Sequence, residues 1–271
     1  MIQPEDCPFD VAEAVAHVQA RVDAAPVETD PFPHMVIREL FPAALYDRLV
    51  EGWPPEASFY RSNAYARQEL TLPLMIERVP TALLPFWHGV MQVAGAANRR
   101  VRARLLGHFA AKFAPILGAD WAAKVEGVPF IEGDGAHLAT YHGNIHLPAH
   151  TDHARIVINA FTYVSESAAP EPDLGTVLYR SHGLMLPTNI VLSHADLSRC
   201  VSEAKTVPYR ANDCLAFVNA PTAFHGVRPV DIGERRRRLL MFATLYGPEE
   251  SIRVFGPALG ASGPAASPAT R

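Results

Sequence analysis

Cysteine is scarce in this chain, and the features of a secreted or membrane protein are missing from it. Only three cysteines, Cys7, Cys200 and Cys214, occur among 271 residues. An odd number of mostly distant cysteines fits neither a disulfide framework nor a zinc ribbon. The N-terminus lacks the basic region and apolar core of a signal peptide, and no apolar run is long enough to span a bilayer. We therefore expect a cytoplasmic protein with no membrane partner.

Charge of one sign is also limited. The formal net charge is −4, with 19% charged and 49% hydrophobic residues, which is an ordinary globular composition. The acidic balance argues against a nucleic-acid partner. It also favours a solvated helix face over a basic patch for the four arginines Arg99, Arg100, Arg102 and Arg104.

The first half of the chain shows helical periodicity. We predict helices over residues 10–25, from Pro42 through Leu49 and, as a pair, over 84–117, and a short strand over 35–37. The second helix of the pair is expected to carry one apolar face formed by Val101, Leu105, Phe109 and Phe113.

From about Ala136 the pattern changes to short apolar, β-branched segments separated by turns. Strands are predicted within residues 155–164, 176–179, 190–192, 205–207, 214–218 and 239–246. The expected fold is α+β: a double-stranded β-helix (jelly roll) with N-terminal supporting helices. We predict one domain over 1–255, with a helical part at 1–135, a jelly-roll core at 136–250, and a disordered tail at 256–271 that is rich in Ala, Pro, Gly and Ser.

Two histidines and an aspartate form the candidate metal site. His150 and Asp152 are two residues apart at the end of a predicted strand, where alternation puts both side chains on the same side. His225 follows the predicted strand 214–218, whose end can lie next to the first in a jelly roll. Two imidazoles and one carboxylate are the ligands of the facial triad that holds Fe(II) and leaves positions open. The plainer alternative is a surface His-Asp pair with an unrelated His225.

Three other histidines, His142, His146 and His153, lie close to this pair in the sequence. Pro148 separates His146 from His150, and no glutamate follows His146, so the helical zinc-protease motif is absent. We expect these three histidines to face the substrate, support the ligands or be exposed, and not to bind metal.

The run from Arg235 to Arg238 precedes the last predicted strand. A nucleic-acid patch is the weakest interpretation, and a solvated strand start explains two of the four. In the functional interpretation one arginine points into the barrel and pairs with a carboxylate, which suits its planar fork. Alternation places Arg235 and Arg237 on one face, and Arg236 and Arg238 on the other.

These residues together resemble the Fe(II)/2-oxoglutarate-dependent oxygenases, particularly the prolyl-4-hydroxylase-like branch. Tyr141 stands nine residues before His150, as the family's tyrosine does before its first iron histidine. After the distal histidine the family's pattern is matched by Val227, Pro229, Val230, Gly233 and Arg235. The chain departs from the pattern at Asn144, where the family often has glycine, and at Leu147, where it often has an aromatic residue.

The resemblance implies roles for these residues. His150, Asp152 and His225 would bind Fe(II), and Tyr141 would assist in binding the co-substrate 2-oxoglutarate. The spacing from His225 favours Arg235 as the arginine for its distal carboxylate, whereas the distance to the apolar strand favours Arg237.

The activity so implied is hydroxylation of an unactivated C–H bond of a small molecule or peptide, with O2 consumed, succinate and CO2 released, and ascorbate as a stimulant. Asp152 argues for hydroxylation over halogenation, because similar halogenases lack this carboxylate. The alternatives are a cupin-like metalloenzyme that does not use 2-oxoglutarate and a non-catalytic jelly-roll binding module. The sequence leaves the substrate and the oligomeric state open.

Overall fold

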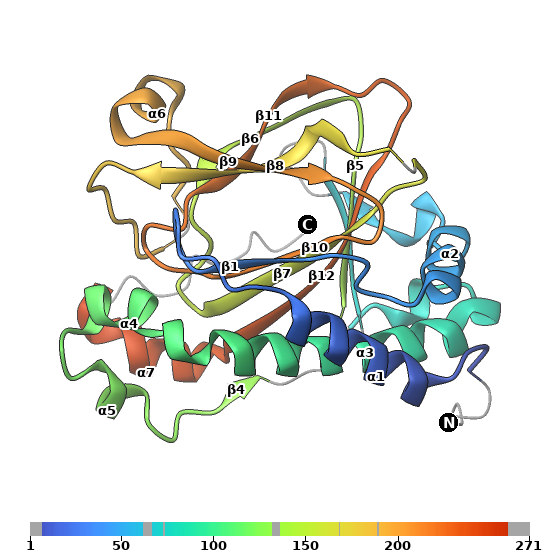
Figure 1. Cartoon of the computed structure of the whole chain (residues 1–271), viewed down its shortest axis with the longest axis horizontal. Helices are drawn as coiled ribbons and strands as arrows, with labels where there is room; N and C mark the ends of the chain where they lie inside the picture. Colours follow the sequence, from blue (N-terminus) through green and yellow to red (C-terminus); the bar gives the residue numbers. More distant parts are fainter. Residues whose placement is uncertain are drawn as a thin grey trace, which may run out of the picture.

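Two antiparallel sheets face each other, and a layer of helices covers the outer face of the larger sheet (Figure 1). The computed structural model describes residues 7–61, 67–72, 74–131, 136–167, 169–188 and 190–259. Within them the α-helices are α1 (Val11–Ala24), α2 (Ala43–Glu51), α3 (Leu84–Leu105), α4 (Ala110–Leu117), α5 (Trp121–Val125), α6 (His194–Cys200) and α7 (Pro248–Leu259). Single 3₁₀ turns lie at Glu56–Ser58, Ile76–Arg78, Thr81–Leu83 and Leu106–His108.

The larger sheet has the strand order β1-β10-β7-β12-β5-β3-β2, with β4 paired to β12, and the smaller sheet has the order β6-β11-β8-β9. The strands of the larger sheet are β1 (His34–Ile37), β2 (Tyr60–Arg61), β3 (Arg67–Thr71), β4 (Phe130–Ile131), β5 (His137–Tyr141), β7 (Ile156–Val164), β10 (Cys214–Val218) and β12 (Arg237–Tyr246). Those of the smaller sheet are β6 (Asn144–His150), β8 (Glu171–Ser181), β9 (Val201–Tyr209) and β11 (His225–Asp231). Two opposed antiparallel sheets of this kind form a jelly roll, as predicted.

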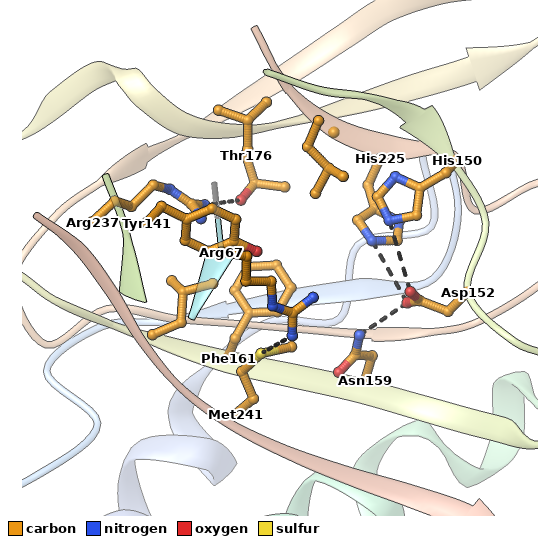
Figure 2. Close-up of a pocket in the computed structure, with 14 residues that line it drawn as sticks. Arg67, Tyr141, His150, Asp152, Asn159, Phe161, Thr176, His225, Arg237 and Met241 are labelled. Atoms are coloured by element: carbon orange, nitrogen blue, oxygen red, sulfur yellow. Dashed lines mark hydrogen bonds and ion pairs between the residues drawn. The ribbon is translucent and has the colours of Figure 1, made fainter. Parts of the chain in front are cut away.

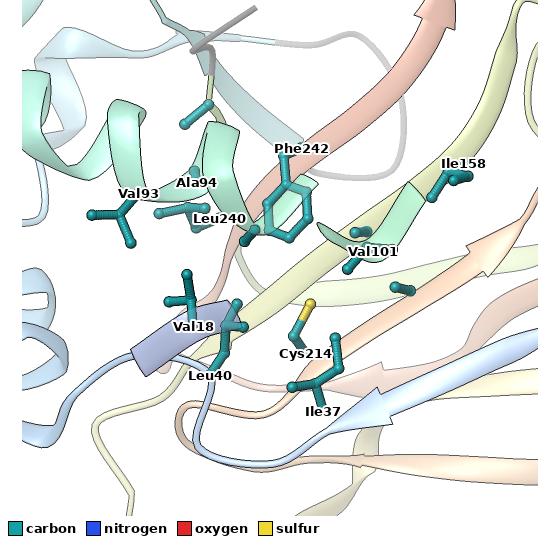
Figure 3. Packing of buried hydrophobic residues seen from close by; sticks show 14 of the residues in the cluster. Val18, Ile37, Leu40, Val93, Ala94, Val101, Ile158, Cys214, Leu240 and Phe242 are labelled. Carbon is teal, nitrogen blue, oxygen red and sulfur yellow. The ribbon is translucent and has the colours of Figure 1, made fainter. Parts of the chain in front are cut away.

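The central strands of the larger sheet are buried on both faces. In β10, Cys214, Ala216 and Val218 pack toward the helices, while Leu215 and Phe217 pack between the sheets. A strand covered on both sides reads as a continuous apolar run, which is why this segment is recognisable in the sequence. In β12 the same alternation sends Leu240 and Phe242 to the helix side (Figure 3).

The helical layer forms where the sequence predicts it. Asp10 caps α1 by accepting a hydrogen bond from the backbone N–H of Glu13 at 3.0 Å. Val18 and Val22 on its inner face are fully buried, in the same cluster as residues of α3 and β12. Figure 3 shows Val18 in this cluster. The apolar stripe of α1 thus secures the N-terminal segment to the back of the larger sheet.

The structure differs from the predicted elements at several boundaries. The pair of helices over 84–117 breaks at a 3₁₀ turn around Gly107, so that Val101 and Leu105 belong to α3 and Phe113 to α4. Glycine has low helix propensity, which accounts for the break. Residues 190–192 are not a strand, because Val191 forms only an isolated bridge with His150. The prediction for these residues was wrong.

The two ends of the predicted domain plan also differ. The part predicted as helical supplies β1, which is the strand predicted over 35–37, and also β2, β3 and β4, which were not predicted. Helix α7 runs to Leu259 because Val254 and Phe255 are buried in the core, so the first residues of the predicted disordered tail are helical. Residues 260–271 lie outside the described residues. None of the helices in the described ranges is long and apolar enough to cross a bilayer, and Cys7, Cys200 and Cys214 are unpaired.

Candidate metal centre

The three predicted metal ligands meet at the edge of the smaller sheet. His150 ends β6, His225 begins β11, and the two face each other directly in the antiparallel register. Asp152 follows two residues after His150 and points the same way, while the hydroxyl of Thr151 donates away to the carbonyls of Leu186 and Thr188. One ligand atom from each of His150, Asp152 and His225 lies within 4.8 Å of the others (Figure 2). In the described part of the chain this is the only such group of three.

The tautomers of both histidines leave a lone pair facing the cluster. Nδ1 of His150 lies 2.9 Å from the carbonyl oxygen of Pro148, and Nδ1 of His225 lies 3.1 Å from that of Ala223. A carbonyl oxygen only accepts, so each Nδ1 carries the proton and each Nε2 is an acceptor. The Nε2 atoms lie 3.8 and 3.6 Å from the carboxylate oxygens of Asp152. These distances are too long for hydrogen bonds, and three converging electron pairs fit a bound cation.

Two asparagines hold the aspartate in place. Nδ2 of Asn159 donates to Oδ2 of Asp152 at 2.9 Å. The side chain of Asn219 accepts from the backbone N–H of Asp152 and donates to the carbonyls of Asp152, His153 and Ile156 at 3.0 to 3.3 Å. The loop that carries the carboxylate is therefore fixed at both its backbone and its side chain, which is how outer residues orient a metal ligand.

Electrostatics keep His150 and Asp152 in the protonation states that metal binding requires. Burial, together with His225, lowers the pKa of His150 to about 4. Burial by itself would raise the pKa of Asp152, but His225, His150, the bond from Asn159 and the nearby Arg67 guanidinium lower it overall. Near neutral pH, His150 is thus a neutral imidazole and Asp152 a carboxylate, as metal binding requires.

The cluster opens into a pocket between the two sheets with an empty volume of about 400 Å³, part of which is open to solvent. Besides the three candidate ligands its walls comprise Arg67, Tyr141, Leu147, Asn159, Phe161, Thr176, Gly226, Val227, Arg237, Leu239 and Met241. Apolar and aromatic residues make up about half of the lining, which also has two arginines and only one carboxylate, Asp152, among the described residues. Such a cavity with a few convergent polar groups is typical of a small-molecule site.

Arg237 lies at the far side of this pocket from the triad (Figure 2). It is 2% exposed, its Nε donates to the carbonyl of Leu174 at 2.8 Å, and its Nη2 lies 3.4 Å from Oγ1 of Thr176. Its guanidinium lies 5.2 to 5.9 Å from the ring centres of Tyr141, Tyr163 and Tyr209. Among the described residues no carboxylate pairs with it. A buried cation in this setting is a ready partner for an anionic ligand.

The other arginines of the run lie elsewhere. Arg235 does not line the pocket; it is largely exposed and pairs with Glu171 at 2.7 Å. Arg238 pairs with Glu166 at 2.6 Å and stacks near Trp53. Of the candidates for the co-substrate, Tyr141 and Arg237 share the pocket and Arg235 does not.

Sequence reasoning missed several residues of the site. Three of them, Asn159, Thr176 and Asn219, are single polar residues inside or beside apolar strands. A polar residue in such a position was the feature of the sequence that could have identified them. Arg67 comes from a segment with no recognisable motif. Of the other nearby histidines, His146 is exposed, and neither it nor His142 or His153 joins the ligand cluster.

Comparisons with known proteins identify the fold. A scan against protein-family models finds no match, and no curated protein matches the sequence. A prolyl 4-hydroxylase from Phytophthora capsici has a TM-score of 0.50 at 14% identity, covering 89% of this chain and 67% of that one. A Pseudomonas putida prolyl-4-hydroxylase gives 0.43 at 14% over 85% and 99% of the two chains. A Trichoplax adhaerens prolyl hydroxylase in complex with a hypoxia inducible factor peptide gives 0.46 at 8% over 88% and 90%. The likeness to the Phytophthora capsici enzyme confirms the predicted fold and the resemblance of that fold to these oxygenases.

Proposed function

We propose that the chain is an Fe(II)- and 2-oxoglutarate-dependent dioxygenase that hydroxylates an unactivated C–H bond of a small molecule or peptide, releasing succinate and CO2. One observation carries the proposal. The same pocket holds a His-Asp-His cluster with its lone pairs facing inward and a buried arginine that no described carboxylate pairs with. A site for a metal ion alone needs only the His-Asp-His cluster. A site for a metal ion and a dicarboxylate that chelates it needs the buried arginine as well.

Each polar group of the pocket then has a role. His150, Asp152 and His225 would hold Fe(II) on one side and leave positions open on the other. Arg237 would bind the distal carboxylate of 2-oxoglutarate. The Thr176 hydroxyl already accepts from Tyr163 at 2.8 Å and faces Arg237, so its own proton is available to donate to that carboxylate. Tyr141, with its ring against Arg237, would help to position it.

When bound, iron with 2-oxoglutarate and O2 supplies the oxidising power for the C–H bond, and the protein supplies geometry and keeps water out. The two sheets enclose the site, and Leu147, Phe161 and Val227 give it apolar walls. Asp152 supports hydroxylation over halogenation because the carboxylate occupies a ligand position itself. We propose that the protein acts in the cytoplasm.

The test is succinate formation from 2-oxoglutarate by anaerobically purified protein that is given Fe(II), ascorbate and oxygen. We expect succinate from the wild type and none from His150→Ala. His146→Ala is the matched control, because His146 lies on the same strand and is exposed. No succinate and no binding of Fe(II) or 2-oxoglutarate would overturn the proposal in favour of a cupin-like or non-catalytic protein.

A further inference from the structure

The pocket contains a second arginine that the proposed function does not use. Arg67 begins β3, which lies between β5 and the edge strand β2 of the larger sheet, and its side chain is 24% exposed. Across the sheet, Arg237 pairs with Tyr141, and Tyr141 pairs with Arg67, so the three side chains form a row on the pocket face. The guanidiniums of Arg237 and Arg67 lie 5.2 and 5.8 Å from the centre of the Tyr141 ring. The pocket therefore offers two separate cationic positions.

Arg67 lies on the triad side of Tyr141. Figure 2 shows its guanidinium between Tyr141 and Asn159, with one Nη atom toward Met241 and the other toward the triad. An anion held there would lie beside the open side of the metal centre. The Tyr141 ring lies between the two guanidiniums, and Arg237 is at the far end of the row. A single carboxylate of the co-substrate therefore cannot bind Arg237 and Arg67 at the same time.

The bonds of Arg67 orient it without filling its pocket-facing donors. Its Nε pairs with Oε1 of Glu69 at 2.6 Å, and Glu69 does not line the pocket. Glu69 is itself held by the hydroxyl of Tyr60 and by His137, whose Nε2 lies 3.7 Å away. Among the described residues, Nη2 of Arg67 lies 3.3 Å from Nε2 of His137 and 3.7 Å from Sδ of Met241, and neither of these groups is a carboxylate. An ionised acceptor would bind these donors more strongly than the groups now beside them.

We infer that Arg67 binds a carboxylate of the prime substrate, and that the substrate is therefore a small carboxylic acid, such as a free amino acid or an aliphatic acid. The walls around it, Phe161, Leu239 and Met241, are apolar and suit the hydrocarbon body of such a molecule. A carboxylate requirement at Arg67 narrows the substrate classes that the sequence left open. It excludes a neutral saccharide and an internal peptide segment, because neither brings a carboxylate to this position. The inference rests on the proposed function.

The experiment uses the full chain loaded anaerobically with Fe(II) and 2-oxoglutarate, whose complex is first verified by its charge-transfer absorption band. Butyrate, hexanoate and a panel of free L-amino acids are then titrated, each beside its primary amide, and the shift of that band is followed. We expect acids to bind at least about tenfold more tightly than their amides, because only the ionised acid can form a charge-assisted bond with the guanidinium.

Variants assign the preference to Arg67. Arg67→Gln should abolish the difference between acid and amide, and Arg67→Lys should keep part of it because the charge remains while the planar fork is lost. Arg180→Gln is the matched control, since Arg180 is an exposed arginine paired with Asp30. It should leave the preference unchanged.

The outcomes separate the two proposals. Failure to form the 2-oxoglutarate complex in wild type would overturn the proposed function and this inference with it. A complex that forms but prefers no acid over its amide would overturn the inference alone, and this measurement needs no variant. So would a loss of 2-oxoglutarate affinity in Arg67→Gln as large as the loss of acid binding, because Arg67 would then serve the co-substrate.

Discussion

At the scale of single residues, the four consecutive arginines show how neighbours with the same side chain acquire different surroundings. Arg235 and Arg238 pair with glutamates near the surface, whereas Arg237 is buried among tyrosines. The sequence limited the choice by alternation but could not decide between Arg235 and Arg237. The decision depends on where β12 begins, and strand ends are set by pairing with distant partners, here β5 and β7.

This difference predicts the effect of two substitutions on the binding of 2-oxoglutarate. Arg237→Met should weaken 2-oxoglutarate binding to the Fe(II)-loaded protein by about tenfold to a hundredfold, because the bond to a charged group is lost. Arg237→Lys should recover only part of it. Arg235→Met tests the other candidate and should change the dissociation constant by less than about twofold. An anaerobic titration followed by absorbance measures all three, and a larger effect from Arg235→Met would reverse the assignment.

Lys112 is a second residue with an unusual place. It is 1% exposed, its Nζ donates to the carbonyl of Asn219 at 3.0 Å, and it lies 5.4 Å from the ring centre of Phe255. Burial lowers its pKa to about 7, although the charge of Asp152 acts in the opposite direction. Between pH 7 and 10.5 the unfolded chain thus holds a proton on this amine that the folded chain has lost.

The lowered pKa of Lys112 makes the free energy of unfolding depend on pH. Stability should rise with pH where the unfolded state binds more protons, by at most about 1.4 kcal/mol per pH unit, and this gain is lost as pH falls toward 7. Lys112→Met removes the group, so the difference in unfolding free energy between wild type and variant should shift toward wild type from pH 8 to pH 10. Urea denaturation across that range measures it. The neighbouring His153 has a lowered pKa and does not titrate there. Parallel curves for the two proteins would refute the burial argument.

At the scale of elements, the metal centre depends on how closely β11 approaches β6. His225 and His150 are paired residues, and Gly226 follows at a register shift between the His225 and Val227 pairs. A Cβ on Gly226 would lie 2.5 Å from the carbonyl oxygen of Leu147 and 3.1 Å from that of Pro148. Backbone atoms cannot yield as a flexible side chain can, so the two strands would have to separate.

Gly226→Ala should therefore affect both stability and the site. We expect a loss of about 1–3 kcal/mol of unfolding free energy from overpacking, and Fe(II) affinity reduced about tenfold because the two imidazoles move apart. Gly52→Ala is the control, since its Cβ would meet the carbonyl of Arg48 at 2.9 Å, at the end of α2 and away from the metal centre. It should lower stability without changing metal affinity. Equal Fe(II) affinity in wild type and Gly226→Ala would show that the close approach does not set the ligand geometry.

The elements also show what the sequence reveals and where it stops. Helix α1 and strand β10 were predictable because each has a strong local pattern, a capped amphipathic stripe in one and an unbroken apolar run in the other. The triad was predictable because His150 and Asp152 sit at a strand end in a spacing that puts them on one side. Strand β1 was predictable as the apolar stretch 35–37, whereas β2, β3 and Arg67 were not, because β3 is short and polar and forms by pairing with β2 and β5.

At the scale of the whole molecule, the helices support one face of the larger sheet and the pocket lies on its other face. Both the helix-side core and the core between the sheets include side chains of β7, β10 and β12, because the side chains of these strands alternate between the two. The metal centre joins the smaller sheet, through His150 and His225, to the loop that leads into β7, through Asp152. A ligand bound there therefore links parts of the chain that separate on unfolding.

Metal and co-substrate should consequently stabilise the folded protein in a fixed order. Anaerobic Fe(II) at a hundred times its dissociation constant should raise the unfolding free energy by about 2.7 kcal/mol, because only the folded chain assembles the site. Adding 2-oxoglutarate should give a second increment only when the metal is present, since it needs both the open metal positions and Arg237. His225→Ala should lose both increments, and Arg237→Met should keep the first and lose most of the second. Thermal or chemical denaturation measures these differences. Stabilisation of the metal-free protein by 2-oxoglutarate as large as that of the loaded protein would show that the co-substrate binds independently of the triad, and would separate the two halves of the proposed site.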